Sequence, residues 1–502
     1  MSHRRRALWS GAALALALAF SAPSALAEET LADAIALAYE TNPTLAAQRA
    51  NQRALDETYV QARTAYRPTA DVSVGATYTD SSFGGDSDSG SVTLSATQPL
   101  WTGGRATRGV DAARADIEQG RENLRAVEAQ ILASVIQAYV DVRRDTEALR
   151  INQANVSVLQ RQLDEASARF EVGEITRTDV AQAEARLASS QAALAGSQAQ
   201  LSVSRAAYAA VVGQAPTDLA PEPALPGVPA SFEEAIAIAE RDNPNVRAAL
   251  RGEEASRARV AQARAQYNPS VGLSATYGSS DSLSDFADSF TDNDSATVRG
   301  TVSIPIFTGG LTSSRVRQAI ERNNASILGI ESARREALRL VSQNWATVLS
   351  TRAALTANEE QVRAAQIAAE GVRQEAQVGL RTTLDVLNAE LELRNAQLAL
   401  ISARRDNYVA TALLLSAMGK LEATQLVGVG EGPGQVTPYD PRTNFRRVKD
   451  KGKVPVLEDI VEALDHLGAP SGRHQFNDPD APIDTALEAI ATNPNGAPIP
   501  QP

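Results

Sequence analysis

The sequence predicts an internally duplicated, mainly α-helical chain that also carries β-strands of membrane-spanning length. Three observations support this prediction. One segment of the sequence recurs in a second copy. In each copy the segment is followed by runs of alternating polar and apolar residues, and these are followed by a long stretch without proline. Because a few strands alone leave open sheet edges, the pattern also predicts an assembly of several chains.

Residues 1–27 have the three parts of a secretory signal peptide. Arg4–Arg6 form a basic region, Ala12–Phe20 an apolar run, and Ala25–Ala27 a cleavage site of small residues. The apolar run is too short to span a bilayer as a helix. Removing the segment changes the net charge from −12 to about −15. We expect export and cleavage; an uncleaved anchor is the alternative.

Composition excludes several classes of function. The chain has no cysteine, and of its three histidines only His466 and His474 lie beyond the signal, near the C-terminus. Disulfides, thiolate metal sites and a histidine-based active site in the main body are therefore excluded, and no catalytic or phosphate-binding motif occurs. The net negative charge argues against a nucleic-acid partner. We expect no enzyme, no cofactor and no metal site.

An internal repeat divides the chain. Thr30–Tyr66 recurs as Ser231–Tyr267, and Gln98–Gly104 recurs as Ile304–Gly310. A proline-rich stretch separates the two copies and predicts a stiff, extended linker. The predicted domains are a signal peptide at 1–27, a first repeat at 28–213, a linker at 214–230, a second repeat at 231–419 and a partly disordered C-terminal extension at 420–502.

Each copy predicts a pair of long helices. Gly103–Glu171 has one nearly unbroken helical pattern, which at 1.5 Å per residue spans about 100 Å. Val172–Glu174 then supplies a turn before a second helix that ends near Val212. Large residues recur on that helix every seven positions, as in a coiled coil. They are Val180, Leu187, Leu194, Leu201 and Tyr208, and the second copy repeats them as Val386, Leu393 and Leu400.

Two strands precede each helix pair. Apolar and polar residues alternate over about nine to eleven positions, the length of a tilted transmembrane strand. The apolar members begin at Val72, Val92, Val271 and Val298, and Tyr78, Tyr277, Trp101 and Phe307 lie at the ends. A half-buried soluble sheet would alternate in the same way, but the signal peptide favours a membrane sheet.

The number of strands predicts the assembly. No segment after the signal has the roughly 18 uninterrupted apolar residues of a spanning helix, so strands must make any membrane span. Four strands cannot close a barrel, and eight leave no aqueous lumen, whereas three chains supply about twelve. The sequence therefore predicts a homotrimer with about four membrane strands per chain, in contact with lipid.

Two motifs resemble one known family. Gly379–Leu387 resembles the helix-turn signature of the TolC family of outer-membrane channel proteins, and Phe170–Val180 resembles its partner in the first copy. The resemblance covers about residues 28–427. It implies a Gram-negative outer-membrane barrel continued by a periplasmic, antiparallel coiled-coil tunnel. It also implies a periplasmic adaptor and an inner-membrane ABC or RND transporter as partners, in drug efflux or type I secretion.

The resemblance further implies a gate at the helix turns. By matched position, Asp179 and Arg381 would be lock partners in the closed state, and Asp385 would be a carboxylate of the constriction. The alternative is an exposed ion pair between Arg381 and Asp385 on one helix face.

This chain departs from the best-known members at two gate positions. Asn388 replaces a second aspartate, and Ala376 replaces a tyrosine. We expect weaker cation selectivity from the smaller ring charge. Arg177 would supply a compensating bond.

The turns themselves match the tips that adaptors contact in the family. The candidate adaptor-binding residues are Val172, Gly173, Val378, Gly379 and Leu380. Glycine at these positions also serves the turn, so the two roles are compatible.

Some features are left open. Both strand–strand loops are rich in aspartate, at Asp86, Asp88, Asp281, Asp285, Asp288, Asp292 and Asp294. A solvated loop or a divalent-cation site would explain them. The extension holds every lysine of the chain, and only 456–467 predicts a helix there. A non-transporting trimeric coiled-coil scaffold or adhesin remains the alternative function.

Overall fold

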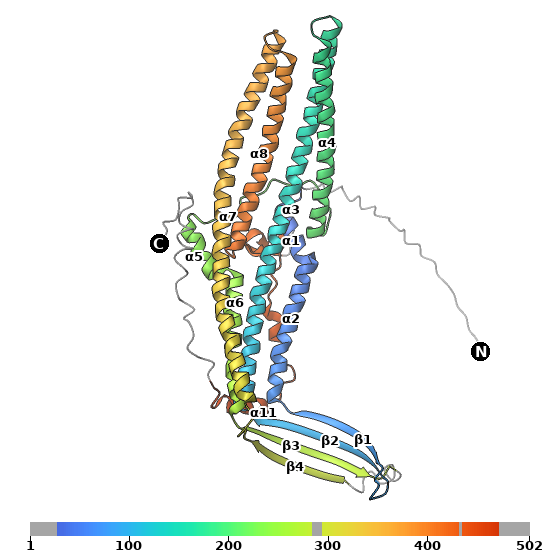
Figure 1. Ribbon diagram of the computed structural model, residues 1–502, viewed down its shortest axis with the longest axis vertical. Coiled ribbons are helices and arrows are strands. Elements are labelled where there is room, and N and C mark those ends of the chain that lie inside the picture. The colour runs from blue at the N-terminus through green and yellow to red at the C-terminus, as the bar shows by residue number, and fades with distance from the viewer. Residues whose placement is uncertain (1–27, 284–293, 431–433, 471–502) are drawn as a thin grey trace, which may run out of the picture.

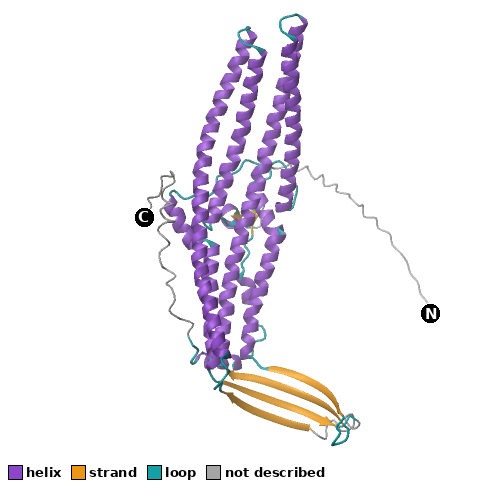
Figure 2. Ribbon diagram, viewed as in Figure 1, coloured by secondary structure: helices purple, strands orange, loops and turns teal. Residues whose placement is uncertain are grey.

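The computed structural model describes residues 28–283, 294–430 and 434–470. Long helices run side by side, and a four-stranded sheet lies at one end of them (Figures 1 and 2). The signal peptide, Asp285, Asp288, Asp292 and His474 lie outside the described residues.

The two copies have the same order of helices. The first copy contains α1 (Leu31–Thr41), α2 (Pro43–Arg63), η1 (Thr64–Tyr66), α3 (Arg105–Glu171) and α4 (Arg177–Val212). The second contains α5 (Phe232–Asp242), α6 (Pro244–Arg264), η2 (Ala265–Tyr267), α7 (Leu311–Gln377) and α8 (Thr383–Ala417). Helices α3 and α7 each have 67 residues, so the long helix expected in the first copy is confirmed.

An Asn-Pro pair starts α2 and recurs at the start of α6. The Asn42 side chain accepts hydrogen bonds from the backbone of Thr44 and Leu45, and Pro43 fits the first helical turn, where no backbone donor is needed. The Asn42 amide Nδ2 also donates to the Val211 carbonyl at 3.1 Å, near the end of α4. Asn243 donates to the Ala417 carbonyl at 2.8 Å in the same way. Each pair therefore ties a short helix to the end of its long helix pair.

The seam between α3 and α4 alternates large and small layers. Leu187, Leu201 and Tyr208 are buried, as the heptad pattern predicted. Between them lies a polar layer, in which Asn155 Nδ2 donates to Ser190 Oγ at 2.7 Å. Small side chains let the helices approach closely, which explains how a chain with 4% aromatic residues packs well.

The strands form one antiparallel sheet in the order β1-β2-β3-β4. They are β1 (Thr69–Thr79), β2 (Ser87–Trp101), β3 (Ser270–Asp281) and β4 (Asp294–Ser303). The pairing of β2 with β3 joins the two copies. Strand β2 has 15 residues, more than the sequence predicted, because it continues past β1 through an irregularity at Pro99/Trp101. Among the described helices, none is both long and apolar enough to cross a membrane.

Paired glycines make the joints between sheet and long helices. Gly103 and Gly104 have φ values of 68° and 84°, and Gly309 and Gly310 have 60° and 85°. Side chains rarely adopt this left-handed region, so glycine is required there. A Cβ on Gly103 would lie 2.5 Å from the Asn268 Cβ, whereas the equivalent atom on Gly309 would meet no atom of the described chain within 4 Å.

The C-terminal extension folds back onto the first copy. It contains α9 (Ala423–Leu426), β5 (Gly428–Val429), β6 (Gln435–Val436), α10 (Arg442–Val448) and α11 (Leu457–His466). The helix expected at 456–467 is confirmed. The expectation that the remainder is extended or disordered is wrong for α9 and α10, because Phe445 of α10 packs edge-on against Tyr59 at 5.1 Å and gives that short helix a partner.

Two buried carboxylates hold α11 in place. Glu458 accepts hydrogen bonds from Arg63 Nε at 2.6 Å and Arg67 Nε at 3.0 Å. Asp465 accepts five hydrogen bonds from Thr102, Gly104 and Thr107 at the start of α3. Burial acts to raise the pKa of Asp465, but these hydrogen bonds outweigh it and hold the pKa below its usual value. Asp465 therefore caps α3 from a distant part of the chain.

We predict that Asp465→Asn loosens the extension, because the amide NH₂ faces donors instead of accepting from them. Cleavage of residues 434–470 by added protease should accelerate by roughly tenfold or more, as expected for a buried charged group that loses its partners. Asp459→Asn, at an exposed position of the same helix, is the matched control. Equal cleavage of both variants would contradict the cap.

The same contact should respond to pH. Both Glu458 and Asp465 have a pKa lowered in the folded chain, so their stabilisation is present above the usual carboxyl pKa and is lost as pH falls. We expect a fluorophore on Ala463→Cys to become mobile below about pH 4.

Candidate functional site

The sheet has one apolar and one polar face. Cross-strand pairing places Val72, Leu94, Tyr277 and Ala296 in one row, and Ala70, Ala96, Ala275 and Val298 in the next. The opposite face carries rows such as Asp71, Ser95, Thr276 and Thr297, or Thr69, Thr97, Ser274 and Arg299. This register suits a sheet with lipid on one side and water on the other.

The outer ends of the strands carry tyrosine–aspartate pairs. Tyr78 donates its hydroxyl to Asp86 at 2.8 Å, and Tyr277 donates to Asp294 at 3.0 Å. These two aspartates therefore bond within the hairpins themselves. Trp101 closes β2 at the opposite end, whereas Phe307 follows β4 and lies outside the strand.

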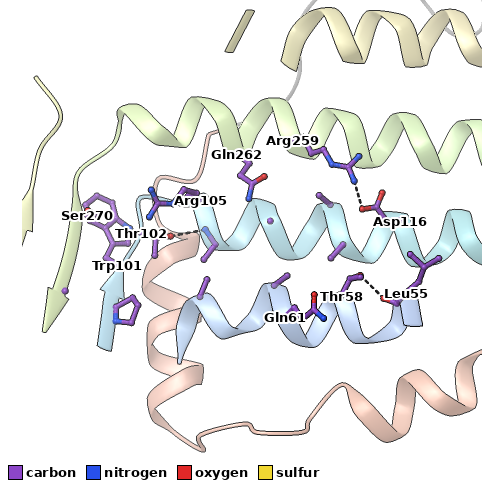
Figure 3. A pocket seen from close by; sticks show the side chains of 18 of the residues that line it. Leu55, Thr58, Gln61, Trp101, Thr102, Arg105, Asp116, Arg259, Gln262 and Ser270 are labelled. Carbon is purple, nitrogen blue, oxygen red and sulfur yellow. Dashed lines mark hydrogen bonds and ion pairs between the residues drawn. The ribbon is translucent and has the colours of Figure 1, made fainter. Parts of the chain in front are cut away.

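A cavity of about 920 Å³ opens beside the sheet, between α2, α3 and α6. Figure 3 shows Thr58 and Gln61 of α2, Asp116 of α3, and Arg259 and Gln262 of α6 around it. Arg259 forms an ion pair with Asp116 across the cavity. Thr97, Trp101, Ser270 and Val271 also line it, so the cavity adjoins the end of the sheet from which the helices continue.

The helix turns lie at the far end of the long helices (Figure 1). In each turn a left-handed glycine ends the first helix, with φ of 76° at Gly173 and 80° at Gly379. Glu174 N donates to Arg169 O, and Leu380 N donates to Glu375 O, both at 2.9 Å. The two copies thus build the same glycine-based helix stop.

Two predicted gate carboxylates act as local helix caps. Asp179 accepts from Thr176 N at 2.9 Å and Thr176 Oγ1 at 2.8 Å, and Asp385 accepts from Thr382 N at 3.0 Å and Thr382 Oγ1 at 2.9 Å. These hydrogen bonds lower the pKa of both carboxyl groups. Both groups therefore carry negative charge at the turns near neutral pH.

Within one chain, Arg381 does not pair with Asp179. Its Nε donates to Glu375 Oε2 at 2.7 Å, across the same turn, and this pair raises the pKa of Arg381. Arg177 is exposed at the first position of α4. A lock between Asp179 and Arg381 would thus require a different side-chain arrangement or a neighbouring chain.

Asn388 joins the two helix pairs. Its Oδ1 accepts from Arg186 Nη2 of α4 at 3.1 Å. Asn388 was predicted from the sequence, but Arg186 was not, and neither were two arginines through which α8 contacts α3. Arg394 donates to Asn152 at 3.0 Å, and Arg405 donates to Asp141 at 2.7 Å. Their positions beside the heptad seam were an available signal, because charges there select coiled-coil partners.

The predicted adaptor-binding residues form exposed apolar tips. The exposed fraction is 73% for Val172, 72% for Val378 and 75% for Leu380. Apolar side chains exposed to this degree at a helix turn do not contribute to the packing of their own chain, which is typical of a docking surface.

Comparison with known proteins identifies the family. The family model described as "Outer membrane efflux protein" matches residues 34–214 and 235–420. The outer membrane efflux protein BepC of Brucella suis is 34% identical over 423 residues, which cover 84% of this chain and 91% of BepC. The outer membrane protein TolC of Vibrio cholerae is 27% identical, with 82% and 95% covered. The alkaline protease secretion protein AprF of Pseudomonas aeruginosa is 29% identical, with 68% and 72% covered.

Solved structures agree with these relatives. The outer membrane protein VceC of Vibrio cholerae is 25% identical and matches with a TM-score of 0.66 over 78% of this chain and 96% of VceC. The open state of the MtrE channel of Neisseria gonorrhoeae is 25% identical and matches with a TM-score of 0.68 over 78% and 90%. The resemblance inferred from the two turn motifs is confirmed, and the chain belongs to the outer membrane efflux protein family.

Proposed function

We propose that this protein is the outer-membrane exit duct of a tripartite efflux or type I secretion system. It lies in the outer membrane of a Gram-negative cell, with its helical tunnel in the periplasm. In this proposal the duct is a passive channel that an inner-membrane ABC or RND transporter and a periplasmic adaptor recruit. Relatives named for efflux and for protease secretion support both cargo classes.

The two-faced sheet is the observation that carries this proposal. Its apolar rows suit lipid, while its polar rows suit a water-filled passage. A coiled-coil scaffold or adhesin does not require a sheet with one apolar face and an opposite face that carries polar rows such as Asp71 and Ser95. Family members form trimeric channels, and three copies would close the sheet.

The proposal predicts that purified protein forms trimers that resist dissociation in detergent and conduct ions in planar bilayers. Chemical cross-linking in detergent measures the first property, and single-channel recording measures the second. A trimer without conductance would contradict the duct and favour the scaffold.

We propose that the turns close the duct at rest, with Arg381 holding a carboxylate of a neighbouring helix. Arg381→Ala should therefore raise single-channel conductance several-fold, because the closed constriction limits ion flow. Glu375→Ala distinguishes a lock with a neighbouring helix from the pair within the turn, since it removes the partner that Arg381 has within its own turn.

If Asp179→Ala raises conductance as Arg381→Ala does, and Glu375→Ala does not, Asp179 is the lock partner. Arg363→Ala is the matched control, because Arg363 is exposed on α7 and pairs with Glu360 of the same helix. Unchanged conductance in Arg381→Ala would overturn the gate.

We propose that the apolar tips bind the adaptor. Val172→Asp and Leu380→Asp should each reduce cross-linking to the adaptor by roughly tenfold or more, because a charge in a desolvated contact is strongly unfavourable. Conductance of the isolated trimer should stay unchanged. Val228→Asp, in the linker between the copies, is the control, and equal loss of cross-linking there would contradict a specific role of the tips.

A further inference from the structure

Helix α11 has an apolar stripe that nothing in the described chain covers. Its inner face buries Glu458, Val461 and Asp465 against the first copy. Its outer face carries Ile460 and Leu464, one helical turn apart, and two further exposed apolar residues, Val456 and Leu467, lie directly before and after the helix. Their exposed fractions are 69% for Val456, 52% for Ile460, 44% for Leu464 and 67% for Leu467.

The start of the stripe is held in a strained conformation. Val456 has a φ of 67°, and it is the one non-glycine residue with positive φ among those that the structure describes. It is the centre of a tight turn in which Leu457 N donates to Pro455 O at 2.8 Å. A branched side chain is unfavourable there, and yet it contributes no buried contact to the fold.

A basic segment lies directly before α11. Arg446, Arg447, Lys449 and Lys451 are exposed, and Lys453 follows. The Lys451 carbonyl accepts a hydrogen bond from Arg67 Nη1 at 2.8 Å, and Arg67 lies two residues before β1 begins. In a chain of net charge −12, the positive charge of Lys451 therefore lies near the start of β1, next to Lys449 and to Lys453, which also pairs with Asp459 at 2.8 Å.

The fold places α11 on the lipid-facing side of the sheet. Gln98 continues the apolar-face positions Leu94 and Ala96, and its Nε2 donates to the Tyr66 carbonyl at 2.9 Å. Tyr66 in turn shares an apolar cluster with Val461 of α11. Figure 1 shows α11 at the foot of the helices, next to the sheet.

We propose that α11 and the basic segment 446–453 form a membrane-surface anchor that binds anionic phospholipid of the leaflet facing the helical tunnel. The apolar stripe lies among the upper acyl chains, and the arginine and lysine side chains bind the headgroup phosphates. Lipid is favoured over a second copy of this chain because the stripe and the positive charges adjoin each other at the strand ends, where headgroups lie.

Site-directed spin labels test the anchor directly. The chain has no cysteine, so Ile460→Cys and Leu464→Cys each give one labelled site in the full-length trimer. In nanodiscs that contain phosphatidylglycerol, both labels should be accessible to oxygen and shielded from a water-soluble nickel chelate. His466→Cys, on the polar flank of the same helix, is the matched control and should show the reverse.

The outcomes separate the possible occupants. Labels at 460 and 464 that meet the nickel chelate as readily as the label at 466 lie in water, which would overturn the proposal. Labels shielded from both reagents are covered by protein, which would also overturn it.

Headgroup charge is tested in the Leu464→Cys background. The oxygen-to-nickel accessibility ratio should be several-fold higher with phosphatidylglycerol than with phosphatidylcholine alone, and Lys449→Glu combined with Lys451→Glu should abolish that preference. Arg150→Glu, exposed on α3 far from the sheet, should preserve it. Equal ratios in both lipids for the parent protein would overturn the role of the charges, even if the double variant failed to assemble. Conductance of the labelled trimer, recorded in parallel, reports on the duct separately.

Discussion

Unpaired backbone groups at the two edges of the sheet are the constraint on which the rest of the structure depends. Within the described chain, β1 pairs only with β2, and β4 pairs only with β3. In lipid, water cannot satisfy the N–H and C=O groups of the free edges. Neighbouring copies must therefore supply the missing strands, and the order of the strands fixes which edges meet. The helices that continue from those strands are brought together by the same closure.

The helices show the other half of that constraint. Helices α3 and α7 have equal length and equivalent positions in the repeat, but α7 buries far fewer side chains within its own chain than α3 does. Exposed residues of α7 such as Leu328 and Ile367 are therefore available to helices of a neighbouring copy. One chain thus forms only part of the tunnel wall, and assembly with neighbouring copies explains its exposed apolar residues.

The elements that the sequence predicted well depend on local signals. The seven-residue repeat, the two-residue alternation and the turn glycines each act over a few positions, so they predict seams, strands and helix turns. Duplication helped further, because a weak signal such as Gly173 gains weight when Gly379 repeats it. The tips were predictable for the same reason.

The sequence could not predict contacts that join distant segments. Glu458 and Asp465 lie in a segment that was predicted as a helix, but the sequence does not indicate that both are buried against groups more than 350 positions earlier in the chain. Likewise, Arg186 looks like an ordinary surface residue until α4 and α8 lie side by side and it donates to Asn388. The pairing of Arg381 with Glu375 across one turn was not predicted either.

The two glycine joints of one chain differ mechanically. The joint at Gly103–Gly104 is enclosed by Asn268, Ala469 and the hydrogen bonds to Asp465, whereas the joint at Gly309–Gly310 has no such enclosure within the described chain. Rotating α3 against the sheet would break those contacts, but rotating α7 would break none of them. Within one chain, the joint of the first copy is thus restrained and the joint of the second copy is free to rotate. The C-terminal extension, which supplies Ala469 and Asp465 to the first joint only, makes the two copies differ.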